Sequence, residues 1–508
     1  MGGIWQHRFF SHLSTSLHIP DAFPLKRSTQ VTQEYATELL YWLGCCVLLR
    51  RAAEMVRCGI LRVERSGGGY RLQTTDKAIA TQFLDRLEFQ RLEALEKSIW
   101  GGKSFNPLEH WKRSDLPSLM QPLIYPWDSG AGIMASYKAL PEVDAHFLAE
   151  AAHFVRIAQS DAGIHPDLRF NELTGEVLSG VAAFVASFHM KHVTFTLHAC
   201  EQLPEVSPVQ SLTIWKPRSE LIQSLVDYSG LPERLASQAL DALSVKTGDT
   251  ELLAKHTTPL RPLLIDLGNG MDLRPVASVM RNPFHTVRTI QEWRDPTIRN
   301  RISEPREDWM RADIYGLFQG DRYLRVNGNI KVRKEGAIAT DVDGAILDRT
   351  SGELALLQIK WQDFYTNDVR QLRSKAKNFV QGMDDWASIV EEWLTRLSDL
   401  GLKQSLRLRD VDAPNITKVY LFGVGRSGAR FKGYGFETKH QMLALANWPQ
   451  FARARYEVGP TDNVFQKLHA RLRLEMEDHV EPEPEPMSVE LFDHEIHFAD
   501  LWSKHLEA

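Results

Sequence analysis

Residues 339–361 read ATDVDGAILDRTSGELALLQIKW, two apolar runs separated by the turn-forming segment DRTSG. Apolar runs around a turn that contains glycine predict a β-hairpin. The second run stays apolar until Gln358 and Lys360, as expected for a buried central strand with two polar groups at its far end. Because side chains alternate along a strand, Gln358 and Lys360 share one face, and antiparallel pairing brings Asp343 close to both.

This hairpin would hold a carboxylate, an amide oxygen and an ammonium group together on a rigid sheet. Such a set suits binding of a hard cation and hydrolysis of a phosphodiester. Asp341 lies on the same alternating face as Asp343 and is a further candidate ligand, whereas Glu335 and Glu307 are weaker candidates for an additional acid. Each polar residue also has a structural explanation of its own. A lysine at a strand end, for example, commonly extends to solvent.

Asp343-Gly344 followed by Gln358-Ile359-Lys360 resembles the PD-(D/E)XK nuclease superfamily, in particular the Mrr-type restriction endonucleases, which carry Asp-Gly on one strand and Gln-x-Lys on the next. The resemblance covers residues 305–424. It implies a restriction-endonuclease-like αβββαβ core and Mg²⁺- or Mn²⁺-dependent hydrolysis of DNA, with a role in restriction or phage defence. It also implies catalytic roles for Asp343, Gln358 and Lys360, with Asp343 and Gln358 at the metal.

Patterns on both sides of the hairpin fit this core. Residues 306–318 have the periodicity of an amphipathic helix, and Asn327-Gly328 signals a tight turn. Residues 366–380 predict a helix whose apolar face lies beside a basic stripe. Next to a metal site this stripe would bind nucleic-acid phosphates, although an ordinary solvated helix face explains it equally well. The basic residues are Arg370, Arg373 and Lys377.

A separate helix over residues 384–400, inserted into the core, and a strand over residues 416–422 are predicted next. The strand leads into Gly423–Gly428, which satisfies the GxGxxG pattern of dinucleotide-binding folds. Such a site needs a helix directly after the glycines, and the segment ARFKGYG that follows is a poor helix former. We therefore interpret the pattern as a chance match.

The N-terminal region has the outline of a winged helix. Residues 33–57 predict one helix or two packed helices, and a hairpin with the turn SGGG follows. Arginines would give this unit a basic face for DNA. The favoured alternative is a small α+β packing unit with solvated arginines. The arginines are Arg50, Arg51, Arg57, Arg62 and Arg65.

The central region predicts an accessory domain. Residues 75–158 are mainly helical in pattern, residues 219–243 are helical, and residues 262–273 predict a hairpin around Gly-Asn-Gly. Residues 192–198 alternate like a strand. The residues that raise the question of a metal site lack a second ligand pair at zinc-finger spacing, so structural or surface histidines are the favoured interpretation. They are His189, His192, His198 and Cys200.

Composition limits the number of domains, the kind of nucleic-acid surface and the expected location of the protein. The chain has 508 residues, long enough for about two to four domains. Its net charge is −5, so a nucleic-acid surface must be local. Four cysteines without a CxxC pair favour a reducing cytoplasm, and the absence of a long apolar run predicts no contact with a membrane.

Together these patterns predict a mixed, multidomain α/β protein with a mainly helical α+β accessory region before the nuclease-like core. DNA is the expected partner, RNA is the alternative substrate, and a homodimer or a defence-complex partner is a further alternative. The competing function is a non-catalytic nucleic-acid-binding or regulatory protein with a degenerate nuclease fold. The predicted divisions are a winged-helix-like unit at 1–90, the accessory region at 91–300, the nuclease-like domain at 301–470, and an acidic, proline-rich linker and tail at 471–508.

Overall fold

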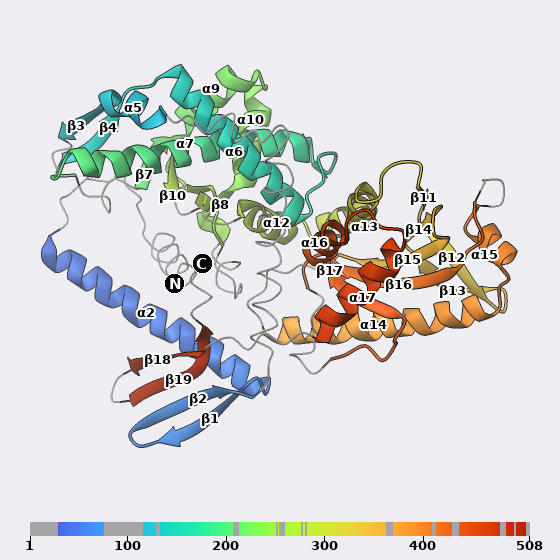
Figure 1. Cartoon of the computed structure of the whole chain (residues 1–508). Coiled ribbons are helices and arrows are strands. Elements are labelled where there is room, and N and C mark those ends of the chain that lie inside the picture. Colours follow the sequence, from blue (N-terminus) through green and yellow to red (C-terminus); the bar gives the residue numbers. More distant parts are fainter. Residues whose placement is uncertain are drawn as a thin grey trace. The chain divides into compact units, whose positions relative to one another are not determined.

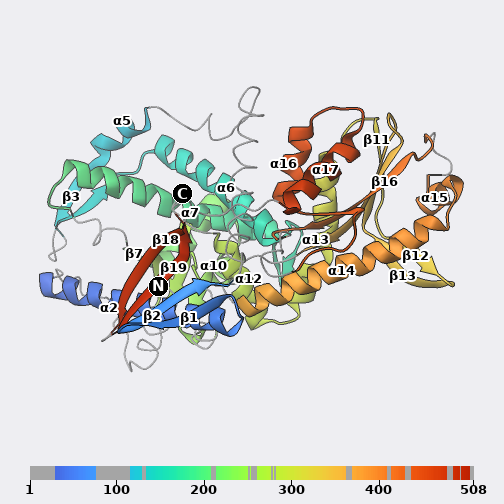
Figure 2. The same cartoon turned by 60° about the horizontal axis from the view of Figure 1, so that its bottom comes forward.

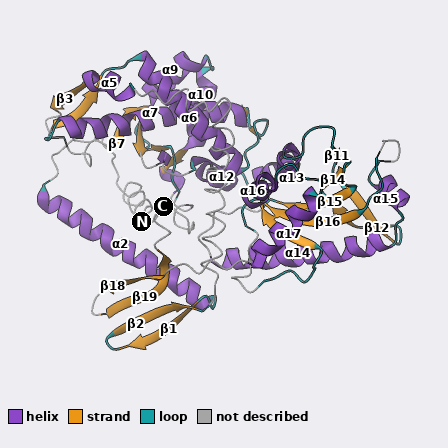
Figure 3. Ribbon diagram, in the orientation of Figure 1, coloured by secondary structure: helices purple, strands orange, loops and turns teal. Residues whose placement is uncertain are grey.

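The computed structural model shows a mixed α/β protein of helices and several small sheets, as predicted (Figures 1 and 3). Two compact units divide the chain: Met1–Val47 with Lys103–Ile302, and Leu48–Gly102 with Ser303–Ala508. The structure describes residues 29–75, 115–128, 133–206, 213–249, 252, 260–275, 278–279, 282–361, 369–408, 413–428, 436–477, 484–491 and 494–503.

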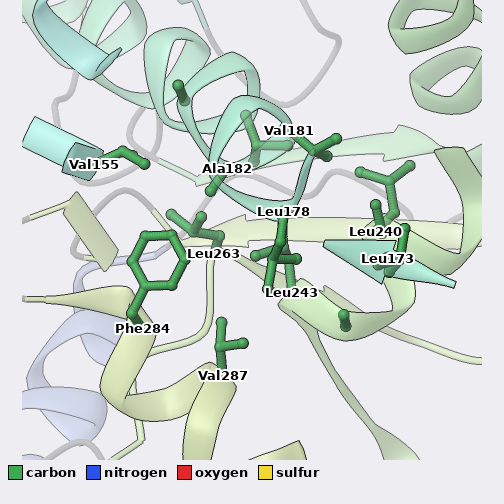
Figure 4. Packing of buried hydrophobic residues seen from close by; sticks show 14 of the residues in the cluster. Val155, Leu173, Leu178, Val181, Ala182, Leu240, Leu243, Leu263, Phe284 and Val287 are labelled. Carbon is green, nitrogen blue, oxygen red and sulfur yellow. The ribbon is translucent and has the colours of Figure 1, made fainter. Parts of the chain in front are cut away.

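The first unit is mainly helical. Its two long helices, α6 (Pro141–Ala162) and α7 (Gly175–Gln202), pack together, and α10 (Glu233–Leu243) and α12 (Pro283–Arg294) contribute to the same core. The Thr174 side chain begins α7 as an N-cap by accepting a hydrogen bond from the Val177 amide. Figure 4 shows apolar side chains meeting in this core, among them Val155, Leu178, Leu243, Leu263 and Phe284.

A sheet in the order β7-β10-β9-β8 belongs to the same unit. The antiparallel pairing of β9 with β10 confirms the hairpin predicted for residues 262–273. The remaining bounds are α5 (Leu116–Met120), η1 (Gln121–Leu123), β3 (Ile124–Asp128), β4 (Ile133–Tyr137), β5 (Arg169–Phe170), β6 (Leu173–Thr174), β7 (Thr213–Pro217), α9 (Arg218–Ser229), β8 (Ser244–Lys246), η2 (Thr247–Asp249), β9 (Leu264–Asp266) and β10 (Met271–Pro275).

One prediction for this unit is wrong, and two others gain detail from the structure. The strand at residues 192–198 is helical, because buried positions continue along α7 at helical spacing through His189, His192 and Ala199, and tertiary packing outweighs the β-propensity of its Val and Thr residues. Of the segment 75–158, predicted as mainly helical, residues 76–114 and 129–132 lie outside the described residues; the described part holds α5, most of α6 and the β3–β4 hairpin. The helical pattern predicted for residues 219–243 is confirmed; it is divided into α9 and α10, since α9 ends at Gly230 with a positive φ.

The second unit is built on a sheet in the order β11-β14-β15-β16-β17. The predicted hairpin is confirmed, with Gly344 opposite Leu357. Strands β11, β14 and β15 are antiparallel neighbours, whereas β15, β16 and β17 run parallel. Helix α14 connects β15 to β16. The bounds are β11 (Tyr323–Val326), β14 (Gly344–Asp348), β15 (Glu353–Lys360), α14 (Val369–Thr395), β16 (Lys418–Gly425) and β17 (Leu443–Asn447).

Helices cover both faces of this sheet (Figure 2). Helices α13 (Ile298–Gly316), α16 (Trp448–Val458) and α17 (Val464–Glu477) share a core with one face, to which Leu357 and Ile359 contribute. Helix α14 lies on the other face, where a Cβ on Gly423 would meet the Met383 sulfur at 2.9 Å. Side chains alternate along β15, so Gln358 lies on the α14 side of the sheet.

Two further predictions need correction. Residues 384–395 continue α14, whose buried stripe runs unbroken through Ala387 and Val390, so the separate inserted helix is wrong; a short α15 (Asp399–Ser405) follows. The segment after Asn327-Gly328 does not pair with β11. It forms β12 (Ile330–Lys334), which makes a hairpin of its own with β13 (Ala337–Val342).

Strands from early and late parts of the sequence share a small sheet of order β1-β2-β19-β18. The predicted helix and Gly-tipped hairpin are α2 (Gln30–Arg57) and β1 (Leu61–Ser66) with β2 (Gly69–Thr74). Strand β2 also pairs in parallel with β19 (His494–Ser503), which departs from a winged-helix pattern; residues 1–28 and 76–90 of that prediction lie outside the described residues. Strand β18 (Pro484–Leu491) begins within the predicted linker.

Candidate active site

Asp343 lies where β13 leads into β14. Its amide donates to the Leu357 carbonyl at 2.9 Å, and its Oδ2 accepts from the Ile359 amide at 2.7 Å. These two bonds fix the carboxylate against β15, between the polar residues Gln358 and Lys360. Only 5% of the Asp343 surface is exposed.

The surroundings of Asp343 act on its ionisation. Its pKa is raised to about 6, chiefly by burial and to a smaller extent by the nearby carboxylates of Glu307 and Asp341. The Ile359 amide and the Lys360 ammonium lower it, but they do not cancel the effect of burial. A cation placed beside this buried carboxylate would stabilise its charged form.

Two glycines allow the close packing around Asp343. A Cβ on Gly344 would lie 2.9 Å from the Tyr315 hydroxyl, which accepts from the Ala345 amide at 3.1 Å. A Cβ on Gly328 would lie 2.3 Å from the Asp343 carbonyl oxygen. Side chains at either position would therefore push Asp343 away from β15. The glycine after Asp343 thus has a packing role that does not depend on catalysis.

Gln358 is buried, with 5% of its surface exposed. Within the described part of the chain no donor forms a hydrogen bond to its Oε1. An amide oxygen that is buried without a hydrogen bond costs free energy, and protein interiors rarely tolerate one. The β14–β15 register sets Gln358 opposite Asp343, so a carboxylate and an amide oxygen lie side by side.

Lys360 ends β15 and is half-exposed. Its Nζ lies 3.4 Å from Glu307 Oε1, which α13 supplies. The site therefore holds an exposed ammonium between a buried carboxylate and a second carboxylate from a neighbouring helix. Glu307, the weaker candidate from the sequence, is brought to the site.

The other predicted acids differ in position. Asp341 lies two residues before Asp343, and its Oδ2 accepts from Lys331 Nζ at 3.0 Å. Its charge acts on Asp343, so it is near the site. Glu335 lies in the β12–β13 turn, and β13 separates that turn from Asp343 by roughly 20 Å at the usual rise of about 3.3 Å per residue, so Glu335 is not a ligand candidate.

The basic stripe is only partly described. Arg373 and Lys377 are exposed on α14, whereas Ala376 and Phe379 are buried, so the predicted division of that helix into faces holds for these residues. Arg370 lies in α14, but its side chain is outside the described part of the structure. The stripe remains a prediction as a nucleic-acid surface.

The sequence did not identify an aromatic and basic cluster next to Lys360. Trp361 stacks on Trp309 with ring centroids 6.3 Å apart, and the guanidinium groups of Arg306 and Arg426 lie 5.4 and 4.9 Å from the Trp361 ring. Arg426 also pairs with Asp313 at 3.3 Å. These contacts join α13 to the ends of β15 and β16. The sequence gives no signal for this cluster, because its residues come from elements that are far apart in the chain.

The GxGxxG segment contributes packing. Gly423 and Gly425 lie inside β16, where a Cβ would meet Leu445 at 2.7 Å and Phe379 at 3.3 Å, respectively. The glycines thus let α14 approach the sheet. Residues 429–435, which would have to form the helix of a dinucleotide site, lie outside the described residues.

The histidines of α7 have protein partners. Both ring nitrogens of His189 lie against backbone carbonyls, at 2.7 Å from Val185 and 3.1 Å from Leu263, and burial lowers its pKa to about 4. His192 Nδ1 lies 3.1 Å from the Tyr137 hydroxyl, and His198 contacts Glu201. Over the residues described, no three His, Cys, Asp or Glu side chains come together as a metal-ligand set.

No family model, curated protein or solved structure matches this chain. None of the helices that the structure describes has the length and apolar character needed to cross a membrane. The site is therefore interpreted from its own geometry.

Proposed function

We propose that the second unit is a metal-dependent nuclease that hydrolyses DNA phosphodiester bonds. The observation that carries the proposal is the pairing of Asp343 with Gln358: a buried carboxylate held by the Ile359 amide, next to a buried amide oxygen that accepts no hydrogen bond from the described residues. A buried polar group without a hydrogen bond needs a physical explanation, and a role in binding a ligand supplies one for Gln358.

With the β12–β13 hairpin and α15 set aside, the elements α13, β11, β14, β15, α14 and β16 follow one another in the αβββαβ order that the resemblance to PD-(D/E)XK nucleases implies, and this order supports the proposal. The residues of the resemblance lie at the edge where β15 and its parallel neighbours end. Ligand sites of sheets with parallel strands commonly occupy that edge.

The residues fit Mg²⁺ or Mn²⁺. Asp343 and Gln358 offer the hard oxygen ligands that these ions prefer, and Asp341 or Glu307 could add a second carboxylate. A glutamine in place of an acid lowers the negative charge of the site, so the chain alone should bind the ion modestly and DNA phosphates should complete the set. When bound, the ion would stabilise negative charge on the phosphate and acidify water.

The chain's own groups have distinct roles in this proposal. The Ile359 amide orients Asp343, and the sheet excludes water from the Gln358 side chain. Lys360 orients the attacking water or takes its proton, and its ammonium form offsets charge on the transition state. Glu307, at 3.4 Å, would hold the Lys360 amine at the site.

Cleavage of plasmid and linear DNA in Mg²⁺ or Mn²⁺ tests the proposal. We expect the wild type to cut and Lys360→Ala to lose at least about 10²-fold in rate. Lys418→Ala is the matched control, because Lys418 is exposed and lies at the opposite end of the neighbouring strand β16. If the wild type cuts neither DNA nor RNA, the proposal fails and a non-catalytic nucleic-acid-binding role takes its place.

A further inference from the structure

The β12–β13 hairpin has one covered face and one open face. Val332 is buried, and Lys334 pairs with Glu392 of α14 at 2.8 Å, so this face packs on α14 (Figure 2). The backbone carbonyl of Asp341 also accepts from Trp386 Nε1 at 2.8 Å. Alternation along β12 then directs Lys331 and Arg333 away from α14.

A β-bulge alters what the open face carries. Val332 pairs with Thr340 but Arg333 pairs with Ile338, so β13 has one extra residue at this point. Directly opposed residues point to the same side of a hairpin, which brings Ile338 beside Arg333 on the open face. Without the bulge Ile338 would point toward α14. Instead it is 55% exposed on the open face.

This open face continues into the candidate active site. Lys331 pairs with Asp341 on the same side, and β13 leads through Val342 directly to Asp343. The Lys331–Asp341 pair is exposed, so it contributes little free energy and Lys331 can exchange its partner for a phosphate. The face thus presents two cations, the Asp341 carboxylate and one apolar side chain along a rigid ribbon that ends at the reactive carboxylate.

We propose that this open face lies in the major groove of double-stranded DNA beside the phosphodiester to be cut. The position of the cut rests on the proposed nuclease function, whereas the groove contact does not. A two-stranded ribbon fits the major groove, and a strand of this length spans about five base pairs. Lys331 and Arg333 would bind phosphates, and Ile338 would contact thymine methyl groups, the apolar feature of that groove. The substrate class is therefore duplex DNA.

Fluorescence anisotropy of the full chain with a 30-base-pair duplex (about three turns) and with the matching single strand, both in EDTA, tests this inference. We expect the wild type to prefer the duplex. Arg333→Gln should weaken duplex binding roughly threefold to tenfold and lower the salt slope by about one. Ile338→Ser should weaken duplex binding roughly threefold without changing the slope, and should leave single-strand binding unaltered.

Lys334→Gln is the matched control, because it removes the same charge from the covered face of the same hairpin. The inference is overturned if the wild type shows no preference for duplex, if Arg333→Gln and Ile338→Ser bind like the wild type, or if Lys334→Gln is as damaging as Arg333→Gln. Hairpin-dependent duplex binding by a protein that never cuts would keep the groove contact and reject the nuclease. Metal-dependent cutting that is unchanged in the Arg333→Gln, Ile338→Ser double variant would keep the nuclease and reject the groove contact.

Discussion

The histidines of α7 and the polar end of β15 are both buried groups that raise the question of a metal. In the first unit, each His189 nitrogen already faces a backbone carbonyl within 3.1 Å. In the second unit, Gln358 Oε1 has no such partner among the described residues, although its burial is comparable. Residue type does not separate the two regions. The hydrogen-bond partners of these two side chains do: the neutral imidazole of His189 donates to one of its two carbonyls, whereas Gln358 Oε1 accepts from no described donor.

The largest expected effect concerns Gln358. Gln358→Leu should lower DNA cleavage by about 10²-fold or more, because a ligand is lost, and should leave stability unchanged or raise it by about 1 kcal/mol, because a buried unsatisfied amide is replaced by an apolar isostere. Cleavage rates and urea unfolding measure the two effects. A variant that cuts normally, or that unfolds far more easily, would place Gln358 with the structural histidines.

His189→Ala should show the opposite pattern. Removal of this fully buried side chain should cost about 2–4 kcal/mol in the unfolding of the first unit, while cleavage remains within about threefold of the wild type. Thermal unfolding beside a cleavage assay checks both. Loss of metal-dependent activity with retained stability would contradict the assignment of His189 to structure.

Asp343→Asn sharpens the contrast through pH. The folded pKa of Asp343 is raised from 3.8 to about 6, so its favourable contribution is fully present below pH 4 and is lost as pH rises through 6. Without metal, the asparagine variant should therefore be more stable than the wild type by about 1–3 kcal/mol above pH 7, and equal to it near pH 4. Denaturant melts at pH 4 and pH 8 in EDTA measure this difference. A difference that does not depend on pH would show that Asp343 ionises normally.

Gly423→Ala should have the smallest effect. The added Cβ would meet the flexible ends of Leu445 and Met383, so we expect destabilisation of about 1 kcal/mol by overpacking. Equilibrium dialysis with NAD should show no binding by either protein. Binding that the substitution abolishes would restore a nucleotide role to the GxGxxG segment.

Much of the second unit could be predicted from its sequence, because its strongest signals are local. The DRTSG turn and the apolar runs around it set the β14–β15 register, and that register places Asp343 beside Gln358. Glu307 reaches Lys360 from α13, some fifty residues earlier, so only tertiary packing could select it over Glu335. The bulge that turns Ile338 outward has no sequence signal either, since Ala339 is an ordinary strand residue.

The first unit was less predictable for a related reason. Residues 192–198 contain β-branched and aromatic residues that alternate, but α7 is buried on several sides, so its apolar pattern lacks the clear helical stripe of a surface helix. The second unit has one similar case: the continuity of α14 past residue 384 depends on a buried stripe that only its packing on the sheet explains.

The most direct test compares wild type, Asp343→Ala and His189→Ala in one plasmid-cleavage assay with Mg²⁺, with folding verified by circular dichroism. The proposal predicts that the wild type and His189→Ala cut at rates within about threefold of each other, and that Asp343→Ala loses about 10³-fold or more. Cutting by Asp343→Ala at the wild-type rate, or no cutting by any of the three, would contradict it.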